Sequence, residues 1–200
     1  NRAGQLGLGN NAVSSFPFEI TSLPNAQKVV AGANHSMALS QNGQLYVWGD
    51  NTQGQVGDGT TLNQNLPQLL SSLSNVEDMA AGENHRLALT NSGEVYVWGS
   101  NARGQLGLDQ LTFSLTPTLL SLPEPIEDIA AGAVHSIFLG QSGKVYVTGG
   151  NDQGQLGINN LTDQFTPVRV MDYPLTINVF ASDFQSFAML PDWAMRIRFN

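Results

Sequence analysis

The chain has 200 residues, of which 41% are hydrophobic and 12% charged, enough apolar material for one folded domain or a short array. Its 16 acidic and 8 basic residues give a formal net charge of -8, which disfavours direct binding to nucleic acid or anionic membranes. No cysteine, no signal-peptide pattern and no apolar run of about 20 residues, the length of a membrane span, is present. The composition predicts a soluble globular protein and leaves its compartment open.

A period of fifty residues organises the chain. The stretch "VVAGANHSMALSQNGQLYVWGDN" from Val29 recurs without gaps as "MAAGENHRLALTNSGEVYVWGSN" from Met79 and "IAAGAVHSIFLGQSGKVYVTGGN" from Ile129. A degenerate fourth copy begins at Phe180 and keeps the register. Such self-similarity predicts stacked copies of one supersecondary unit. We expect a single repeat domain over 1–200, with units at 1–27, 28–77, 78–127, 128–177 and 178–200.

Each complete unit predicts four short strands. In the first, "KVVAG" at 28–32 is small and apolar, whereas "HSMALS" at 35–40 and "QLYVWG" at 44–49 are β-prone and joined by a hairpin with Gly43. The fourth strand carries a proline, at 17, 67, 117 or 167. Proline removes a ladder donor, so this strand is expected at the outer edge, and the small first strand at the crowded inner rim. The pattern predicts an all-β fold, a β-propeller of four-stranded antiparallel blades.

The strand order places the "AGANH" turn and the glycine-rich stretch "NTQGQVGDG" on the same face. This stretch begins at Asn51 and has near-copies at 1, 101 and 151. A phosphate-binding loop needs a helix directly after its glycines, often with a GK[ST] motif. The sequence "DGTTLNQNLPQLL" after Gly57 predicts no helix. We therefore expect the glycines to build the connection between the third and outer strands, with no nucleotide or other cofactor bound.

The linked motifs "AAGAVHSIFL" from Ala130, "VYVWG" from Val95 and "NARGQLG" from Asn101 resemble the regulator of chromosome condensation repeat family along the whole chain. The resemblance implies a β-propeller, usually of seven blades. Four periods leave two interpretations open: part of a seven-bladed ring, which we favour, or four units that close, associate or remain an open arc. For closure, residues 1–20 would supply the outer strand to a last blade built from 180–199.

The recurring polar and aromatic residues are predicted to be structural. The histidines at 35, 85 and 135 occur once per blade, about 10 Å apart, too far to share a metal ion, so we expect their ring nitrogens to bond to backbone in their own blade. Hydrogen bonds within loops are expected for Asn51, Asn101, Asn151, Gln5, Gln55, Gln105 and Gln155. Packing between blades is expected for Trp48, Trp98, Tyr46, Tyr96 and Tyr146.

Catalytic patterns are missing from the sequence. It has no cysteine nucleophile, no G-x-S-x-G elbow and no H-E-x-x-H motif. Glu77–Asp78 and Glu127–Asp128 are paired carboxylates, but their phase in the repeat favours a solvated connection before the inner strand. We therefore predict a protein that is not an enzyme and that has no catalytic, metal-binding or cofactor-binding residues.

The function is predicted from positions that differ between repeats on the shared face, because recurring positions must maintain the fold. We expect a non-catalytic scaffold that binds a protein partner there. The candidate partner-binding residues are Asn34, Asp50, Gln53, Asp58, Glu83, Asn84, Arg103, Asp109, Val134, Asp152, Asp183 and Phe184.

Two alternative functions remain open. The resemblance implies guanine nucleotide exchange on a small GTPase for the founding member of the family. Exchange factors of that type present a wedge-like insertion to the GTPase, for which the constant fifty-residue interval leaves no room. A secreted propeller-type enzyme inhibitor is the second alternative, with Phe184 and Tyr173 as its available aromatic residues.

Overall fold

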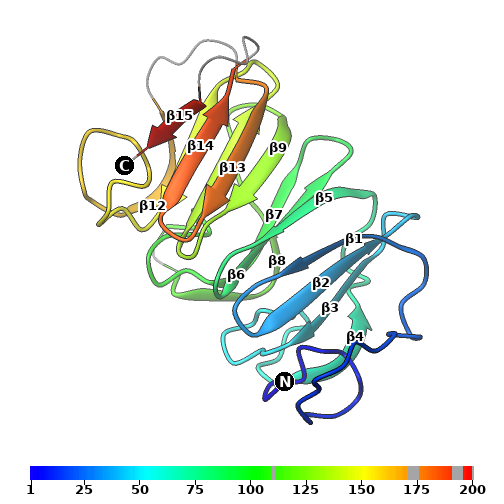
Figure 1. Ribbon diagram of the computed structural model, residues 1–200. Helices are drawn as coiled ribbons and strands as arrows, with labels where there is room; N and C mark the ends of the chain where they lie inside the picture. The colour runs from blue at the N-terminus through cyan, green and yellow to red at the C-terminus, as the bar shows by residue number, and fades with distance from the viewer. Residues whose placement is uncertain (110, 171–175, 191–195, 200) are drawn as a thin grey trace.

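The computed structural model describes residues 1–109, 111–170, 176–190 and 196–199. These residues form 15 β-strands and no helix. The strands make four sheets that follow one another side by side in an open arc, with the two chain termini at opposite ends (Figure 1). We number the sheets as blades one to four in chain order.

Three blades have four antiparallel strands, and the fourth blade has three. Blade one contains β1 (Ala26–Ala31), β2 (His35–Ser40), β3 (Leu45–Gly49) and β4 (Gln64–Leu69). Blade two contains β5 (Val76–Ala81), β6 (His85–Thr90), β7 (Val95–Ser100) and β8 (Phe113–Leu119). Blade three contains β9 (Ile126–Ala131), β10 (His135–Gly140), β11 (Val145–Gly149) and β12 (Gln164–Arg169). Blade four contains β13 (Asn178–Ser182), β14 (Gln185–Met189) and β15 (Arg196–Phe199).

The predicted turn and edge chemistry is confirmed. Gly43 adopts a φ of 71° and its amide donates to the Ser40 carbonyl at 3.0 Å, which closes the hairpin between β2 and β3. Pro67, Pro117 and Pro167 lie in β4, β8 and β12, the strands at the outer edges of their sheets. At these edges the missing proline amide removes no bond from the ladder.

The core consists of three layers, each between two consecutive blades. In the first layer Met37 and Val47 of blade one pack against Met79, Ala88 and Trp98 of blade two. Equivalent side chains pack blade two on blade three and blade three on blade four. Blades two and three therefore each have one face toward the preceding blade and one toward the following blade, as in a propeller.

The glycine-rich stretches at 1–9, 51–59, 101–109 and 151–159, called glycine loops below, fasten consecutive blades together. The loop after β3 leaves blade one and lies on blade two, where the Gln55 carbonyl accepts from Trp98 Nε1 at 3.0 Å and from Arg86 Nε at 2.5 Å. The Gly59 amide donates to the Leu115 carbonyl of β8 at 3.0 Å. The prediction that these glycines serve architecture is confirmed.

The asparagine that begins each glycine loop supports that loop from inside, as predicted. Asn51 is fully buried, and its Oδ1 accepts from the Val56 amide at 2.8 Å. Its Nδ2 donates to the carbonyls of Thr60 and Leu62 at 3.0 and 3.1 Å. Asn101 and Asn151 make the equivalent contacts.

The N-terminal segment differs from the prediction. No strand forms around Pro17, and residues 1–20 do not close a ring with the fourth blade. Instead, the Gln5 carbonyl accepts from Trp48 Nε1 at 2.8 Å and from Ser36 Oγ at 2.9 Å, which holds the segment on blade one. The reason is geometric: blades one and four lie at opposite ends of the arc, so their edges do not meet (Figure 1).

The acidic pairs Glu77–Asp78 and Glu127–Asp128 are also placed differently from the prediction. They lie inside the inner strands β5 and β9 and not in a connection before them. Glu77 and Glu127 are exposed, whereas Asp78 and Asp128 are half-buried. Both pairs lie at an irregularity of the strand pairing, because Val76 and Asp78 face the adjacent residues Thr90 and Leu89, which leaves Glu77 as an extra residue. The same shift occurs at Glu127 in β9.

Candidate protein-binding face

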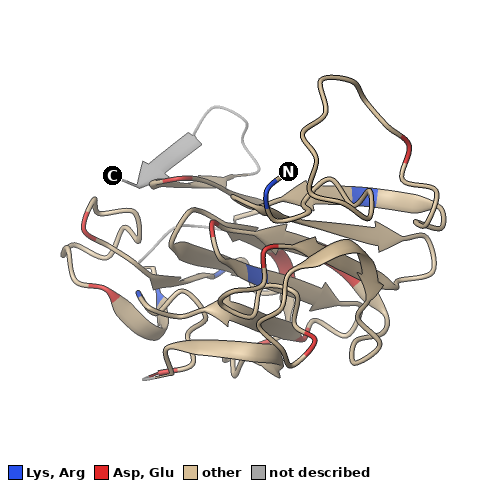
Figure 2. Ribbon diagram, turned by 90° about the horizontal axis from the view of Figure 1, so that it is seen from below, with Lys and Arg blue, Asp and Glu red and all other residues tan. Residues whose placement is uncertain are grey.

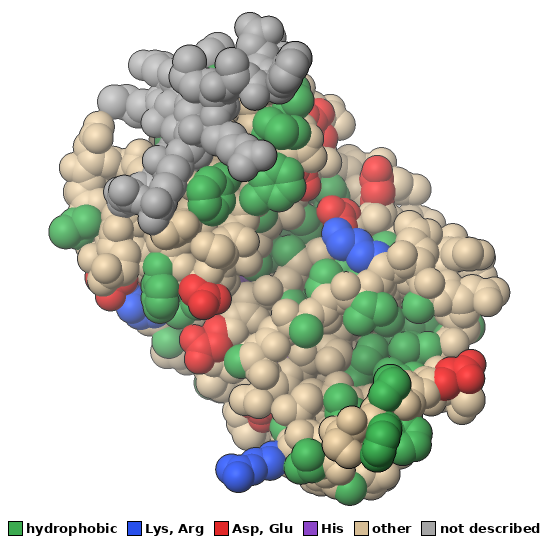
Figure 3. Space-filling view, in the orientation of Figure 1, with side chains coloured by type: hydrophobic (Ala, Val, Ile, Leu, Met, Phe, Trp, Pro, Cys, Tyr) green, Lys and Arg blue, Asp and Glu red, His purple; other side chains and the backbone are tan. Residues whose placement is uncertain are grey.

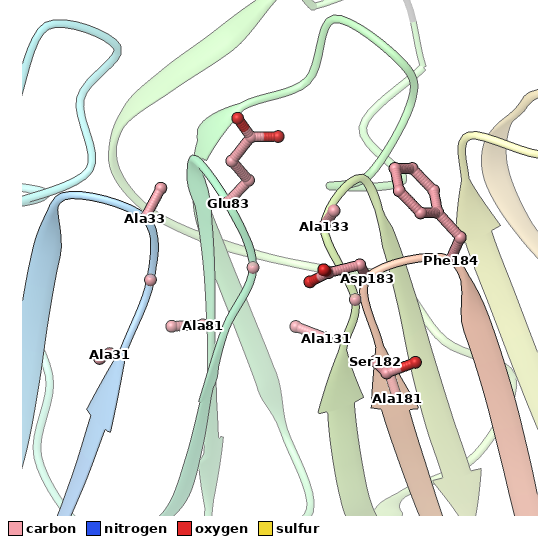
Figure 4. Close-up of a pocket in the computed structure, with 13 residues that line it drawn as sticks. Ala31, Ala33, Ala81, Glu83, Ala131, Ala133, Ala181, Ser182, Asp183 and Phe184 are labelled. Carbon is pink, nitrogen blue, oxygen red and sulfur yellow. The ribbon is translucent and has the colours of Figure 1, made fainter.

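A hollow lies where the four inner turns meet. These turns, residues 32–34, 82–84, 132–134 and, with the last residue of β13 included, 182–184, connect the first and second strands of the blades. The hollow has a volume of about 500 Å³ and is lined mainly by glycine and alanine (Figure 4). Only three lining side chains are large, and all three are exposed: Glu83, Asp183 and Phe184.

A second hollow of about 570 Å³ continues along the inner strands. It shares Ala31, Ala81, Ala131 and Ala181 with the first hollow, so the two form one axial groove. Its ionisable lining residues are Lys28, Asp78 and Asp128, with Lys28 Nζ paired to Asp78 Oδ1. Burial raises the pKa of Asp128, although its carboxylate accepts a hydrogen bond from the Val179 amide. The groove is therefore acidic. Its opening among the inner turns, called the mouth below, carries the carboxylates of Glu83 and Asp183.

Backbone hydrogen bonds join the inner turns into a series. The Ala33 amide donates to the Glu83 carbonyl at 3.3 Å, the Glu83 amide to the Ala133 carbonyl at 3.0 Å, and the Ala133 amide to the Asp183 carbonyl at 3.0 Å. These bonds fix the backbones that carry the exposed side chains. The mouth is thus a preorganised surface, which lowers the entropy cost of binding.

The glycine loops and the inner turns lie on one face, as predicted. The Asp50 amide donates to the Asn34 carbonyl, the Ser100 amide to the Asn84 carbonyl, and the Gly150 amide to the Val134 carbonyl. Gln5 and Gln55 also donate Nε2 to Oδ1 of Asn34 and Asn84. Positions 134 and 184 carry Val and Phe in place of this asparagine, and the buried Gln155 Nε2 has no partner in the described chain.

The other predicted contact residues lie farther out, and most hold their own loops. Asp50 accepts from Thr52 and Gln55, and Gln53 donates its amide to Gln55 Oε1. Although partial burial acts to raise it, hydrogen bonds from Thr60, Asn51 and Gln64 lower the pKa of Asp58. Asp109 uses its backbone amide to bond to the Phe165 carbonyl of blade three.

Arg103 and Asp152 belong to a charge cluster between two glycine loops. Arg103 donates Nε and Nη2 to the two carboxylate oxygens of Asp163 at 2.5 and 2.9 Å, and Asp152 lies 3.4 Å from Nη2. These bonds from Arg103 lower the pKa of Asp163. The cluster ties blade two to blade three, so Arg103 contributes first to the fold.

The histidines do not bond within their own blades, which corrects the prediction. His85 Nε2 lies 3.0 Å from Ser136 Oγ of blade three, and His135 Nε2 lies 3.0 Å from Ser186 Oγ of blade four. The serine hydroxyl donates in turn to the carbonyl of a glycine-loop glutamine, Gln105 or Gln155. The sequence shows a serine 51 residues after His85 and after His135. That each serine contacts its histidine could be recognised only from the way consecutive blades pack.

Blade two breaks this pattern at Arg86. This residue occupies the position of Ser36, Ser136 and Ser186 and is completely buried. Its Nη1 and Nη2 atoms have no hydrogen-bond partner among the described residues, and neither ring nitrogen of His35 has one. Burial lowers the pKa of His35, and the neighbouring charge of Arg86 lowers it further.

We expect Arg86→Ser to stabilise the fold by about 1–2 kcal/mol, because it removes a buried cation with unmet donors and restores a hydroxyl for His35. The opposite change, Ser136→Arg, should lower the free energy of unfolding by more than about 3 kcal/mol. Urea unfolding followed by tryptophan fluorescence measures both. Destabilisation by Arg86→Ser would show that the arginine stem is a needed packing element.

The described residues offer neither a metal-binding group nor a membrane-spanning helix. Within residues 1–109, 111–170, 176–190 and 196–199, no group of three His, Cys, Asp or Glu side chains is arranged to hold a metal ion. The same part of the chain contains no helix of the length and apolar character needed to span a membrane. Tyr173, named with Phe184 for an inhibitor, lies outside the described residues.

Comparisons with known proteins agree with the geometry. The family model described as the RCC1-like domain matches residues 1–192. A segment of 57 residues is 40% identical to the X-linked retinitis pigmentosa GTPase regulator of the dog, covering 26% of this chain and 6% of that protein.

Two solved structures match most of the chain. Human WBSCR16 is 29% identical with a TM-score of 0.82, over 94% of this chain and 50% of that one. Prp20p from Saccharomyces cerevisiae, whose binding to Gsp1p and histones is described with its structure, is 25% identical with a TM-score of 0.80, over 93% of this chain and 48% of that one. This chain thus spans about half the length of the structures it resembles.

Proposed function

The chain belongs to the RCC1-like domain family, and from this premise we propose that it is a non-catalytic scaffold that binds a basic segment of a protein partner at the mouth of its axial groove. The observation that carries the proposal is the composition of that mouth. Glu83, Asp183 and Phe184 project from turns that otherwise carry glycine, alanine, serine, asparagine and valine (Figure 4).

The chemistry of these three side chains fits cationic residues. Two exposed carboxylates attract Lys or Arg, and the exposed ring of Phe184 offers a face for a cation–π contact. The wider charge supports the same partner, because Asp and Glu outnumber Lys and Arg over the blades (Figure 2). Histones, which are basic proteins, are among the binding partners described for the similar protein Prp20p.

A binding assay tests the proposal with a labelled peptide of eight arginines and a matched peptide of eight glutamates. We expect the arginine peptide to bind at low salt, and the double variant Glu83→Lys, Asp183→Lys to weaken its binding at least tenfold. Fluorescence anisotropy measures both affinities.

Two further variants make the assay specific. Glu94→Lys changes a charge in the β6–β7 hairpin, at the opposite end of its strands, and should leave the affinity nearly unchanged. Phe184→Leu should weaken binding of the arginine peptide several-fold, because it removes the aromatic face. Equal losses in the Glu94→Lys and axial variants would mean that only net charge matters, and the proposed site would then be wrong.

Nucleotide exchange is the competing function. Every complete unit has the same fifty-residue length, so none carries the inserted wedge expected of an exchange factor. We expect no acceleration of labelled GDP release from a purified small GTPase in the presence of this chain. A concentration-dependent acceleration would favour exchange activity over the scaffold.

A further inference from the structure

The axial groove carries a second charged level at the end opposite its mouth. Lys28, Asp78, Asp128 and Asn178 occupy the same repeat position, one in each blade, and line the second hollow. We call these four residues the polar row. Its two carboxylates belong to β5 and β9, the inner strands of blades two and three, each of which has a blade packed on either side. On the face shown in Figure 3, acidic side chains lie beside a basic one next to the hollowed middle region.

The polar row has an excess of negative charge. Lys28 Nζ donates to Asp78 Oδ1, which neutralises one of the two carboxylates. Asp128 forms no salt bridge with a described residue. Its Oδ1 accepts from the Ile129 amide and its Oδ2 from the Val179 amide of blade four, both at 2.9 Å. These bonds fix a half-buried carboxylate whose charge is not compensated, and such a group favours a cation from outside.

The backbone between the two levels can accommodate an extended chain. The two hollows meet at Ala31, Ala81, Ala131 and Ala181, whose side chains end at Cβ (Figure 4). The inner strands β5 and β9 are edge strands of their sheets, and the edges that lie away from β6 and β10 border the groove. A peptide in the groove can therefore pair with an exposed strand edge, as in recognition by β-strand addition.

The distance between the two levels sets the spacing of charges in such a peptide. Asp78 precedes Glu83 by five residues in blade two. A strand rises about 3.3 Å per residue, so the Cα atoms of these two residues are at most about 17 Å apart. In an extended ligand, side chains four residues apart point to the same side and lie about 13 Å apart. The length of an arginine or lysine side chain bridges the remaining few Å.

We propose that the basic segment bound at the mouth continues along the axial groove as an extended strand and places a second cationic side chain, four residues from the first, against Asp128. This inference rests on the proposed function and adds the conformation and the charge spacing of the ligand. The first cation pairs with Glu83 and Asp183 at the mouth. Lys28 provides an example of the second contact, because its ammonium group already pairs with Asp78 in the same row.

Two pentapeptides of identical composition test the spacing. Arg-Ala-Gly-Ala-Arg can place one arginine at the mouth and the other at the polar row, whereas Arg-Arg-Ala-Gly-Ala cannot reach both levels. With blocked ends, a fluorescent label and low salt, we expect the spaced peptide to bind the 200-residue chain at least about fivefold more tightly in fluorescence anisotropy. The two peptides carry the same net charge, so long-range attraction does not produce a difference between them.

Three variants locate the second contact. Asp128→Asn should abolish the preference for the spaced peptide. Glu127→Gln is the matched control, since it removes the same charge from the adjacent, exposed residue of β9, which does not line the groove, and it should keep the preference. Lys28→Gln should strengthen binding of the spaced peptide about threefold, because it removes the only basic side chain among the described groove residues and frees Asp78. Circular dichroism establishes that each variant is folded.

The outcomes separate this inference from the proposed function. The inserted strand is wrong if the unmodified chain binds both peptides equally while Glu83→Lys, Asp183→Lys weakens both. It is also wrong if folded Asp128→Asn retains the preference, or if folded Lys28→Gln leaves the affinity for the spaced peptide unchanged. If neither peptide binds, or if the double variant at the mouth binds both as tightly as the unmodified chain, the proposed function itself fails and this inference fails with it.

Discussion

Lowering the pH from 7 to 5 is expected to destabilise the protein by about 6 kcal/mol, or about 2 kcal/mol for each of three buried histidines. His35, His85 and His135 are at most 1% exposed. Burial, and then the charges of His135 and Arg86, lower the pKa of His85 to about 3, and burial lowers that of His135 to about 4. The pKa of His35 is lowered as well.

The direction of this pH effect on stability follows from proton binding. An unfolded histidine binds its proton near pH 6.5, whereas the folded protein keeps these rings neutral until the pH is much lower. Below pH 6.5 the unfolded state therefore binds more protons, and stability falls. Asp58, Glu124 and Asp163 have lowered pKa values and add to acid sensitivity only below the usual carboxylate range. Asp128, with its raised pKa, acts in the opposite direction.

Urea unfolding at pH 7, 6 and 5 measures this loss. His135→Gln supplies the control, because removing one titrating ring should reduce the loss between pH 7 and 5 by about 2 kcal/mol, whatever the variant costs at pH 7. A stability that stays constant over this range, or a variant with an undiminished loss, would contradict the assignment.

Gly104→Ala is expected to lower the free energy of unfolding by about 2–5 kcal/mol, because it adds both backbone strain and overpacking. Gly104 has a φ of +82°, and an added Cβ would lie 2.3 Å from the Gln164 carbonyl oxygen and 2.8 Å from Phe165 Cα. Both atoms belong to β12 of the following blade. The change would push the glycine loop away from blade three and weaken the contact between the blades.

Gly59→Ala provides a matched comparison within the same kind of loop. Gly59 has a φ of +83°, and an added Cβ would meet only Thr116 Cγ2, at 3.8 Å. We therefore expect only the conformational cost, about 1–2 kcal/mol. The difference between the two variants in thermal or urea unfolding measures how closely the loop must approach the next blade. Equal losses would mean that backbone strain alone accounts for both.

Much of the fold could be predicted because its signals repeat. Gly43 and its copies marked the hairpins, Pro67 and its copies marked the outer strands, and the alanines marked the inner rim. Pro17 carried the same signal and yet forms no strand, because a strand needs a partner edge and residues 1–20 are seated elsewhere. A local pattern thus specifies a strand only when its neighbour is present.

The candidate site was harder to predict than the fold. The variable positions included Glu83, Asp183 and Phe184, which line one hollow, but they also included Arg103 and Asp58, whose hydrogen bonds hold the loops. Arg86 was missed because it sits at a recurring position, among serines. The effect of Arg86 on stability depends on its burial and on its contacts with the neighbouring blade. Neither can be inferred from its position in the repeat alone.

The direction of the glycine loops has a consequence for synthesis. Each loop comes from an earlier part of the chain and clamps the blade that is made next, as Gln5 does for Trp48 and Gln55 does for Trp98. A nascent blade leaving the ribosome therefore meets a docking loop that has already been translated. The blades can therefore assemble one after another in the direction of synthesis, because each new sheet docks on a loop that precedes it in the chain.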